Sequence, residues 1–207
     1  MTYLNNLAKR LAGGFDSADG PHADQLLAYR EVDNLRDVSI ITEAATLLAS
    51  ERKIEIRCAI YHVLGKLSSN ASLADATRLL LSRLDERKNR RELDCLLEAI
   101  ANAHKPACLA LVVVQRIIES SKGAMRRNAI RALGGSTNRA SEEYVISLLQ
   151  SSSDYDDIIE CQAVLAKSGS TDALPALRES LRSKSKNVRI SAEVAIERIS
   201  RRQMASS

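Results

Sequence analysis

The chain has 207 residues, of which 45% are hydrophobic and only 3% are aromatic, with no tryptophan. A core of this composition must be built from aliphatic side chains, which favours closely packed helices over an aromatic-rich sandwich or a surface that stacks bases. The formal net charge of +4 is small beside 30 basic and 26 acidic residues. Domains that read nucleic acid concentrate basic residues far more strongly, so we do not expect a nucleic-acid partner.

The cysteines and the apolar runs indicate the compartment. Cys58, Cys95, Cys108 and Cys161 form no C-x-x-C pair, so we expect neither a disulfide framework nor a zinc site. Cys58 and Cys161 are predicted to be packing residues, because free cysteine behaves as a small hydrophobe. The longest apolar stretch, 108–114, is too short to cross a bilayer. We therefore predict a cytoplasmic protein with no membrane partner, metal or cofactor.

Two short helices are predicted before residue 37. Residues 2–11 place Tyr3, Leu4, Leu7 and Leu11 on one face at helical spacing. A second helix is expected over 23–32. Residues 1–36 would either cap the open end of a helical array or form a degenerate first repeat.

From residue 37 the pattern becomes a series of helix pairs. The pairs are predicted at 38–49 with 54–67, 73–84 with 90–103, 106–120 with 124–133, 141–149 with 156–166, and 173–181 with 187–201. Pro106 and Pro175 fit the first turn of a helix. Asn70, Gly134-Gly135 and Gly169 follow second helices, where a left-handed residue often ends the helix. The repeats are expected to occupy 37–202, and a disordered tail 203–207.

The second helices of the pairs resemble one another. Aligning Ile60, Leu96, Ala129, Cys161 and Ala192 gives a repeat every 31 to 36 residues, with apolar residues three and four positions further on. Self-similarity at such a period indicates stacked supersecondary units. The apolar stripe is predicted to be core.

One second helix, 125–134, reads Met-Arg-x-Asn-Ala-x-x-Ala-Leu-Gly, and 56–65 and 188–195 nearly repeat it. This pattern resembles the HEAT repeat family over about 37–202. The resemblance implies an all-α fold, a right-handed α–α superhelix of about five helix pairs plus the N-terminal helices. Leu93 and Ile158 replace the arginine of the pattern, so a continuous polar ladder is not expected. The acidic residue that often precedes this arginine is mostly missing, with Asn187 and Glu55 as the nearest substitutes.

The arginines of the pattern have a structural interpretation. Arg57, Arg126 and Arg189 lie at the edge of the apolar stripe, one turn before the small residue. There an arginine can lay its stem on the core and donate to carbonyls or carboxylates of the neighbouring turn. We predict no catalytic residues.

The resemblance also implies that the second helices line a concave face. Positions two before and two after each reference residue would point away from the core, and His62 is expected to be exposed there. The candidate partner-binding residues are His62, Arg91, Asp94, Glu98, Arg127 and Arg131. This strip changes from neutral through acidic to basic to apolar, which suits a protein partner read by charge and an apolar anchor. The alternative is a set of solvated side chains with no binding role.

The leading hypothesis is a non-enzymatic module that binds a protein on its concave face, as a bacterial immunity protein binds a cognate toxin. The resemblance leaves two alternatives. A DNA-binding or alkylation-repair HEAT protein would need a basic groove and aromatic side chains. A subunit of a phycobiliprotein chromophore lyase would bind a bilin, for which no motif is present. The oligomeric state stays open.

Overall fold

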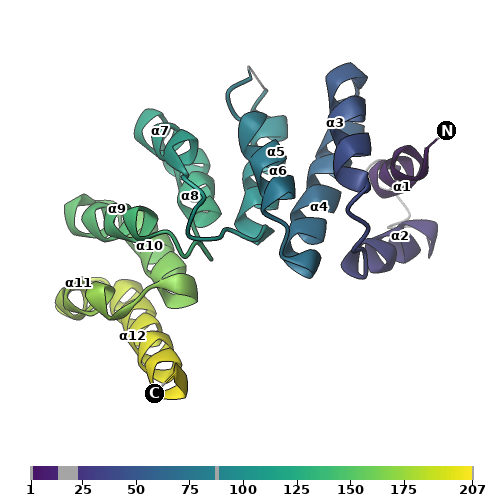
Figure 1. The fold of residues 1–207 in the computed structure, drawn as a ribbon. Coiled ribbons are helices and arrows are strands. Elements are labelled where there is room, and N and C mark those ends of the chain that lie inside the picture. The colour runs from purple at the N-terminus through teal and green to yellow at the C-terminus, as the bar shows by residue number, and fades with distance from the viewer. Residues whose placement is uncertain (1, 14–22, 87–88, 207) are drawn as a thin grey trace. The chain divides into compact units, whose positions relative to one another are not determined.

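The structure is a computed structural model that describes residues 2–13, 23–86 and 89–206. All secondary-structure elements assigned in these residues are helices, apart from an isolated β-bridge between Lys105 and Ser136. The predicted all-α repeat fold is confirmed (Figure 1). None of the helices in the described ranges has the length and apolar character that crossing a bilayer requires.

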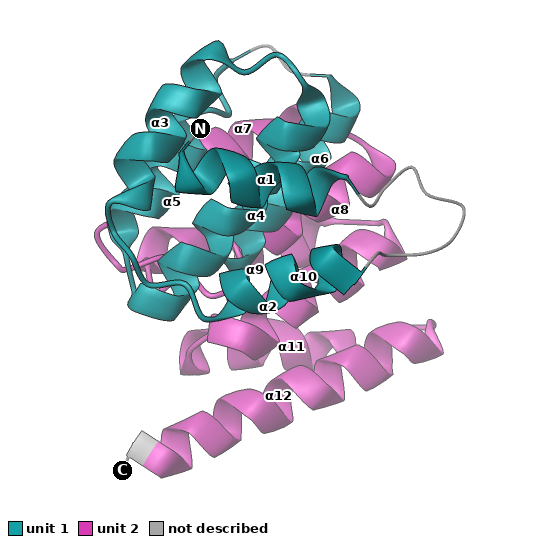
Figure 2. Ribbon diagram, turned by 90° about the vertical axis from the view of Figure 1, so that its right-hand side faces the viewer, with its two compact units in different colours: residues 1–104 teal, residues 105–207 magenta. Residues whose placement is uncertain are grey.

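The chain divides into two compact units, residues 1–104 (unit 1) and 105–207 (unit 2), coloured separately in Figure 2. Sequence analysis did not predict this division, which falls inside the expected repeats. Unit 1 holds α1 (Tyr3–Ala12), α2 (Ala23–Asp33), α3 (Ile40–Ser50), α4 (Ile54–Ala71), α5 (Ala74–Ser82) and α6 (Arg90–Asn102). Unit 2 holds α7 (Val112–Ser120), α8 (Gly123–Ala132), α9 (Arg139–Ser151), α10 (Tyr155–Ser168), the 3₁₀ turn η1 (Thr171–Ala173), α11 (Leu174–Ser180) and α12 (Lys186–Ser206).

In unit 1, α4 is the central helix and packs against α1, α2, α3, α5 and α6. Its stripe residues Ile60 and Leu64 are fully buried, as are their counterparts Leu96 and Ile100 on α6. The α1 helix buries one face, including Leu7, in the same unit. The helices before residue 37 therefore pack within unit 1, and their role as a cap stays a prediction.

One end of the α4–α6 contact depends on glycine. A Cβ atom added to Gly65 would lie 2.6 Å from the carbonyl oxygen of Ala99. No real Cβ contact is this short, so the missing side chain allows the two helix backbones to touch. Gly65 thus sets the close spacing between α4 and α6 at this point.

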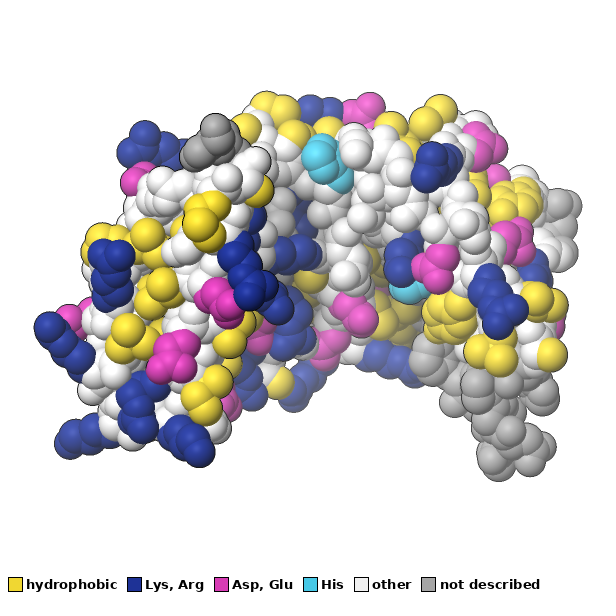
Figure 3. Space-filling model, turned by 90° about the horizontal axis from the view of Figure 1, so that it is seen from below, with side chains coloured by type: hydrophobic (Ala, Val, Ile, Leu, Met, Phe, Trp, Pro, Cys, Tyr) yellow, Lys and Arg dark blue, Asp and Glu magenta, His cyan; other side chains and the backbone are white. Residues whose placement is uncertain are grey.

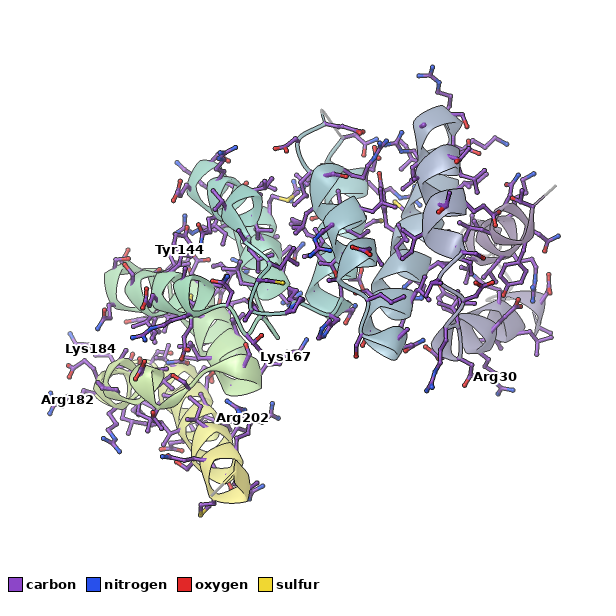
Figure 4. The ribbon with its side chains drawn as sticks, viewed as in Figure 1. Arg30, Tyr144, Lys167, Arg182, Lys184 and Arg202 are labelled. Atoms are coloured by element: carbon purple, nitrogen blue, oxygen red, sulfur yellow. The ribbon has the colours of Figure 1, made fainter. Side chains whose placement is uncertain are left out.

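In unit 2, α10 packs between its neighbours α8, α9 and α12. The aligned residues Ala129, Cys161 and Ala192 are fully buried, so the predicted stripe and the packing role of Cys161 are confirmed. Arg202 of α12, labelled in Figure 4, donates to the carbonyl oxygens of Ala166 at 2.6 Å and Gly169 at 2.7 Å. These bonds satisfy acceptors at the end of α10 that lack a partner within the helix.

The predicted helix 106–120 begins later than expected. The α7 helix starts at Val112, and Pro106 instead belongs to a turn closed by the bond from the Leu109 amide to its carbonyl. The preceding residue, Lys105, accepts a bond from the Thr137 amide at 3.2 Å through its own carbonyl. This long-range pairing holds the segment out of helical conformation despite a proline suited to a first turn.

The other corrections concern helix ends. Of the predicted left-handed residues Gly135 adopts a positive φ of 80°, whereas Gly169 is extended and Asn70 lies inside α4. Ser72 takes the left-handed position after α4 with φ 53°. The expected disordered tail is also wrong over 203–206, because α12 contains no breaker there and continues to Ser206. Residue 207 lies outside the described residues.

Candidate functional site

Pairs of arginine and carboxylate align the second helices within each unit. In unit 1, Nε of Arg57 on α4 lies 2.7 Å from Oε1 of Glu92 on α6. The hydroxyl of Tyr61 donates to the same oxygen at 2.9 Å, and burial raises the pKa of Tyr61 to about 12. The Glu92 side chain is only 8% exposed. A buried carboxylate needs such partners, because an unpaired charge in the interior is costly.

Unit 2 repeats this arrangement two helix pairs further along the chain. Nε of Arg126 on α8 lies 2.7 Å from Oδ2 of Asp157 on α10. The two acids, Glu92 and Asp157, directly precede Leu93 and Ile158, the positions that lack the arginine. The acid that pairs with Arg57 or Arg126 therefore lies in the following repeat, directly before the position that lacks the arginine.

Both acids also begin their helices. The side chain of Asn89 accepts from the Glu92 amide at 2.8 Å, and that of Asp154 accepts from the amides of Asp156 and Asp157. Such N-cap bonds satisfy donors of the first turn. The cap therefore fixes the turn that carries the acid, and the acid in turn holds the arginine of the previous repeat.

Next to the Arg57–Glu92 pair, unit 1 contains a cavity of about 340 Å³, which we call the α4–α6 cavity. Its walls come from α1 (Leu11), α2 (Tyr29), α4 (Cys58, Ala59 and His62) and α6 (Cys95, Glu98 and Ala99). This volume falls at the lower end of the range that accommodates ligands or inserted side chains. Because the lining is mostly apolar with a few polar groups, it has the composition of a recognition site.

Two other cavities do not share these properties. One, of about 270 Å³, lies between the end of α10 and α12 of unit 2, but its guanidinium, Arg202, already binds backbone carbonyls. The other, among Leu133, Val145 and Val164, has a volume of only about 10 Å³. The cavity of unit 1 is therefore the candidate site.

The charges around the α4–α6 cavity leave Glu98 without a counterion. Lys66 binds Asp33 at 2.7 Å, and Arg91 binds Glu55 at 3.3 Å. Among the described residues, the exposed carboxylate of Glu98 forms no hydrogen bond or ion pair. The mouth of the cavity therefore carries an uncompensated negative charge.

His62 does not occupy the exposed position that was expected. It is half-buried, and its ring lies edge-on to that of Tyr29 with 5.4 Å between the ring centroids. Burial, together with the nearby Lys66, lowers the pKa of His62. Its Nε2 atom is buried without a hydrogen-bond partner in the described part of the chain. His62 is buried because α2, a helix outside the repeat pattern, covers this part of α4.

The thiols of Cys58 and Cys95 meet in the cavity wall. They are half-buried, and the interaction between the two side chains lowers the pKa of Cys95 and raises the pKa of Cys58. Cys58 was predicted to be a packing residue, and instead it lines the cavity.

Four of the six predicted binding residues thus gather in unit 1. His62 and Glu98 line the cavity, and Asp94 and Arg91 flank Cys95 closely enough to affect its charge. Tyr29 is the lining residue that sequence analysis missed, because nothing in the sequence places α2 against α4. Cys95 was noted only as a free thiol, although its place in a second helix could have indicated it.

The remaining two predicted residues, Arg127 and Arg131, lie on α8 in unit 2. Both are paired with acids on α10, Arg131 with Glu160 through bonds of 3.0 and 2.7 Å and Arg127 with Asp156 at 3.5 Å. The expected basic end of the strip is therefore charge-balanced. Figure 3 likewise shows acidic and basic side chains interspersed over the face in view.

Comparisons with known proteins agree with this fold. Residues 110–197 match the family described as HEAT repeats. An engineered protein of known structure superposes with a TM-score of 0.50 at 19% identity, covering 97% of this chain and 98% of that one. A designed armadillo repeat protein in complex with the peptide (KR)4 gives a TM-score of 0.52 at 16% identity, covering 96% of this chain and 100% of that one. No curated protein matches the sequence.

Proposed function

Residues 110–197 of this chain are HEAT repeats, and from that premise we propose that the protein is a non-enzymatic module that binds another protein. We further propose that unit 1 receives a lysine or arginine side chain of the partner in the α4–α6 cavity. Helical repeat folds of this kind are typical of protein-binding scaffolds.

The observation that carries the proposal is the uncompensated carboxylate of Glu98 at the mouth of a largely apolar cavity. A long basic side chain has an apolar stem and a charged end. Its stem would contact Ala59 and Ala99, and its charge would meet Glu98. The ring of Tyr29, in the same wall, offers a further partner for a cation.

The similar designed armadillo repeat protein was solved with a peptide of alternating lysine and arginine. That protein shows that a related helical repeat fold can hold a basic peptide. For the present chain the argument rests on Glu98 and its cavity, since the likeness in sequence is low. An immunity protein that neutralises a toxin is the special case in which the partner is a toxin presenting such a side chain.

The proposal is tested with octapeptides as probes. Fluorescence anisotropy would compare a labelled peptide of alternating lysine and arginine with an octaglutamate peptide, each against the purified full chain. The basic peptide should bind and the acidic peptide should not. In Glu98→Gln the affinity should fall about tenfold, because a hydrogen bond to a charged group contributes about 1.5–3 kcal/mol.

Glu193→Gln is the matched control. Glu193 is an exposed acid on the second helix of another pair, and it too has no ion-pair partner among the described residues. This variant should bind the basic peptide as the unmodified chain does. Equal losses in the two variants would show a diffuse charge effect and would refute the assignment of the cavity, as would tighter binding of the acidic peptide.

A further inference from the structure

The α4–α6 cavity contains a feature that partner binding does not use, the pair of thiols of Cys58 and Cys95. The two residues come from neighbouring packed helices and line the same cavity, and the interaction between their side chains shifts the pKa of both. The backbones of these helices approach closely elsewhere along their contact, at Gly65 and Ala99. Two thiols that face one cavity from closely packed helices can be joined without a large backbone movement.

We propose that Cys58 and Cys95 form a peroxide-reactive dithiol, with Cys95 as the attacking thiolate and Cys58 as the resolving thiol, that closes to a disulfide between α4 and α6. This proposal is independent of the partner-binding function. It requires the two side chains to be reachable from solvent, and the cavity provides that access because both are half-buried in its wall.

The surroundings distinguish the roles of the two cysteines. The interaction with Cys58 stabilises the thiolate of Cys95 and, with the nearby guanidinium of Arg91, lowers the pKa of Cys95. The same interaction and burial raise the pKa of Cys58, which keeps its proton. Since the thiolate is the nucleophile, Cys95 reacts first.

The reaction balances with a peroxide as the oxidant. The Cys95 thiolate attacks one peroxide oxygen, the O–O bond breaks, and hydroxide or alkoxide leaves with the bonding electron pair, so that Cys95 becomes a sulfenic acid. The Cys58 sulfur then attacks the Cys95 sulfur, and the S–O bond breaks. The proton of Cys58 passes to the departing oxygen, which leaves as water. Two thiols have lost two electrons to the peroxide in all.

The chain provides two internal comparators. Cys161 is fully buried, and burial raises its pKa to about 12, so it should not react in the folded protein. Cys108 is exposed on the segment before α7. It therefore reports how a solvent-accessible thiol of the same protein responds to the same dose of peroxide.

The test treats the reduced full chain with hydrogen peroxide and maps disulfides by mass spectrometry of unreduced peptides. The expected product is a Cys58–Cys95 cross-link with the loss of two hydrogen masses, formed at doses that leave Cys108 largely unmodified. Cys108→Ser should form the same cross-link. A cross-link that requires Cys108, or none at doses that oxidise Cys108, overturns the proposal.

Single variants test the order of attack. In Cys58→Ser the serine hydroxyl can donate to Cys95, so peroxide followed by dimedone should label Cys95 as a trapped sulfenic acid. In Cys95→Ser, Cys58 should stay unlabelled at the same dose. Circular dichroism confirms that both variants are folded. Labelling of Cys58 in preference to Cys95 would refute the assigned roles.

Discussion

Three arginines at equivalent positions of the repeat should contribute unequally to stability, because their partners differ. Arg57 and Arg126 each bind a buried carboxylate, whereas Arg189 donates to the backbone carbonyls of Ser183 at 2.7 Å and Lys184 at 3.1 Å. Replacement by methionine keeps an unbranched apolar stem on the core and removes the guanidinium. The three substitutions therefore compare partners within nearly constant packing.

The magnitudes follow from what each substitution leaves behind. Arg57→Met leaves Glu92 buried with Tyr61 still donating to it, and the loss of one partner of a buried pair costs about 3 kcal/mol. Arg126→Met should cost at least as much, because Oδ1 of Asp157 already has no hydrogen-bond partner among the described residues. Arg189→Met abandons only carbonyls near solvent, so it should cost about 1 kcal/mol.

Urea denaturation followed by circular dichroism measures the free energy of unfolding. Hydrogen exchange with mass spectrometry then locates the loss, which should appear in residues 2–104 for Arg57→Met and in 105–206 for Arg126→Met. The double variant Arg57→Met/Glu92→Met removes both charges and should regain most of the lost stability. Equal costs for all three arginines, or no recovery in the double variant, would refute this account.

Two further predictions concern packing and pH. Gly65→Ala should destabilise unit 1 by about 1–2 kcal/mol in urea denaturation, because the cost of the overlap with the Ala99 carbonyl exceeds the gain of about 1 kcal/mol in helix propensity. Adding Ala99→Gly should not restore stability, because the overlap is with the backbone of Ala99. Burial, with Lys167 nearby, lowers the pKa of Lys105 to about 7. The unfolded chain therefore binds more protons between about pH 7 and 10.4, and the contribution of Lys105 to stability rises with pH over this window. From pH 7 to pH 10, the unfolding free energy of the unmodified chain should therefore rise relative to that of Lys105→Met. A difference between the two that does not change with pH would contradict the assigned pKa.

Most of the fold could be predicted from local patterns. Apolar periodicity and the small residues of the stripe located the helices, and α4 and α6 begin at Ile54 and Arg90 as expected. The start of α7 could not be predicted, because it depends on backbone pairing between Lys105 and the distant segment 136–137. Helix periodicity contains no information on such a contact.

The candidate site was predicted in part. Periodicity placed His62, Asp94 and Glu98 on one side of α4 and α6, and His62 and Glu98 line the cavity, although His62 is half-buried there rather than exposed. It could not show that Tyr29 would cover His62, since α2 lies outside the repeat. It also could not pair Arg131 with Glu160, because the axial offset between successive helices depends on packing rather than on spacing in the sequence.

The alternation of donors and acceptors among the second helices restricts how such an array can change length. A hairpin ending in α4 supplies an arginine and the next, ending in α6, supplies the acid; α8 and α10 repeat this order. Removing only the hairpin that ends in α4, α6, α8 or α10 would leave a charge of its partner unpaired, whereas removing both hairpins of a pair would not. Duplications and deletions that keep the protein folded should therefore occur two hairpins at a time. Libraries in which these segments are duplicated or deleted would test this by showing which variants fold.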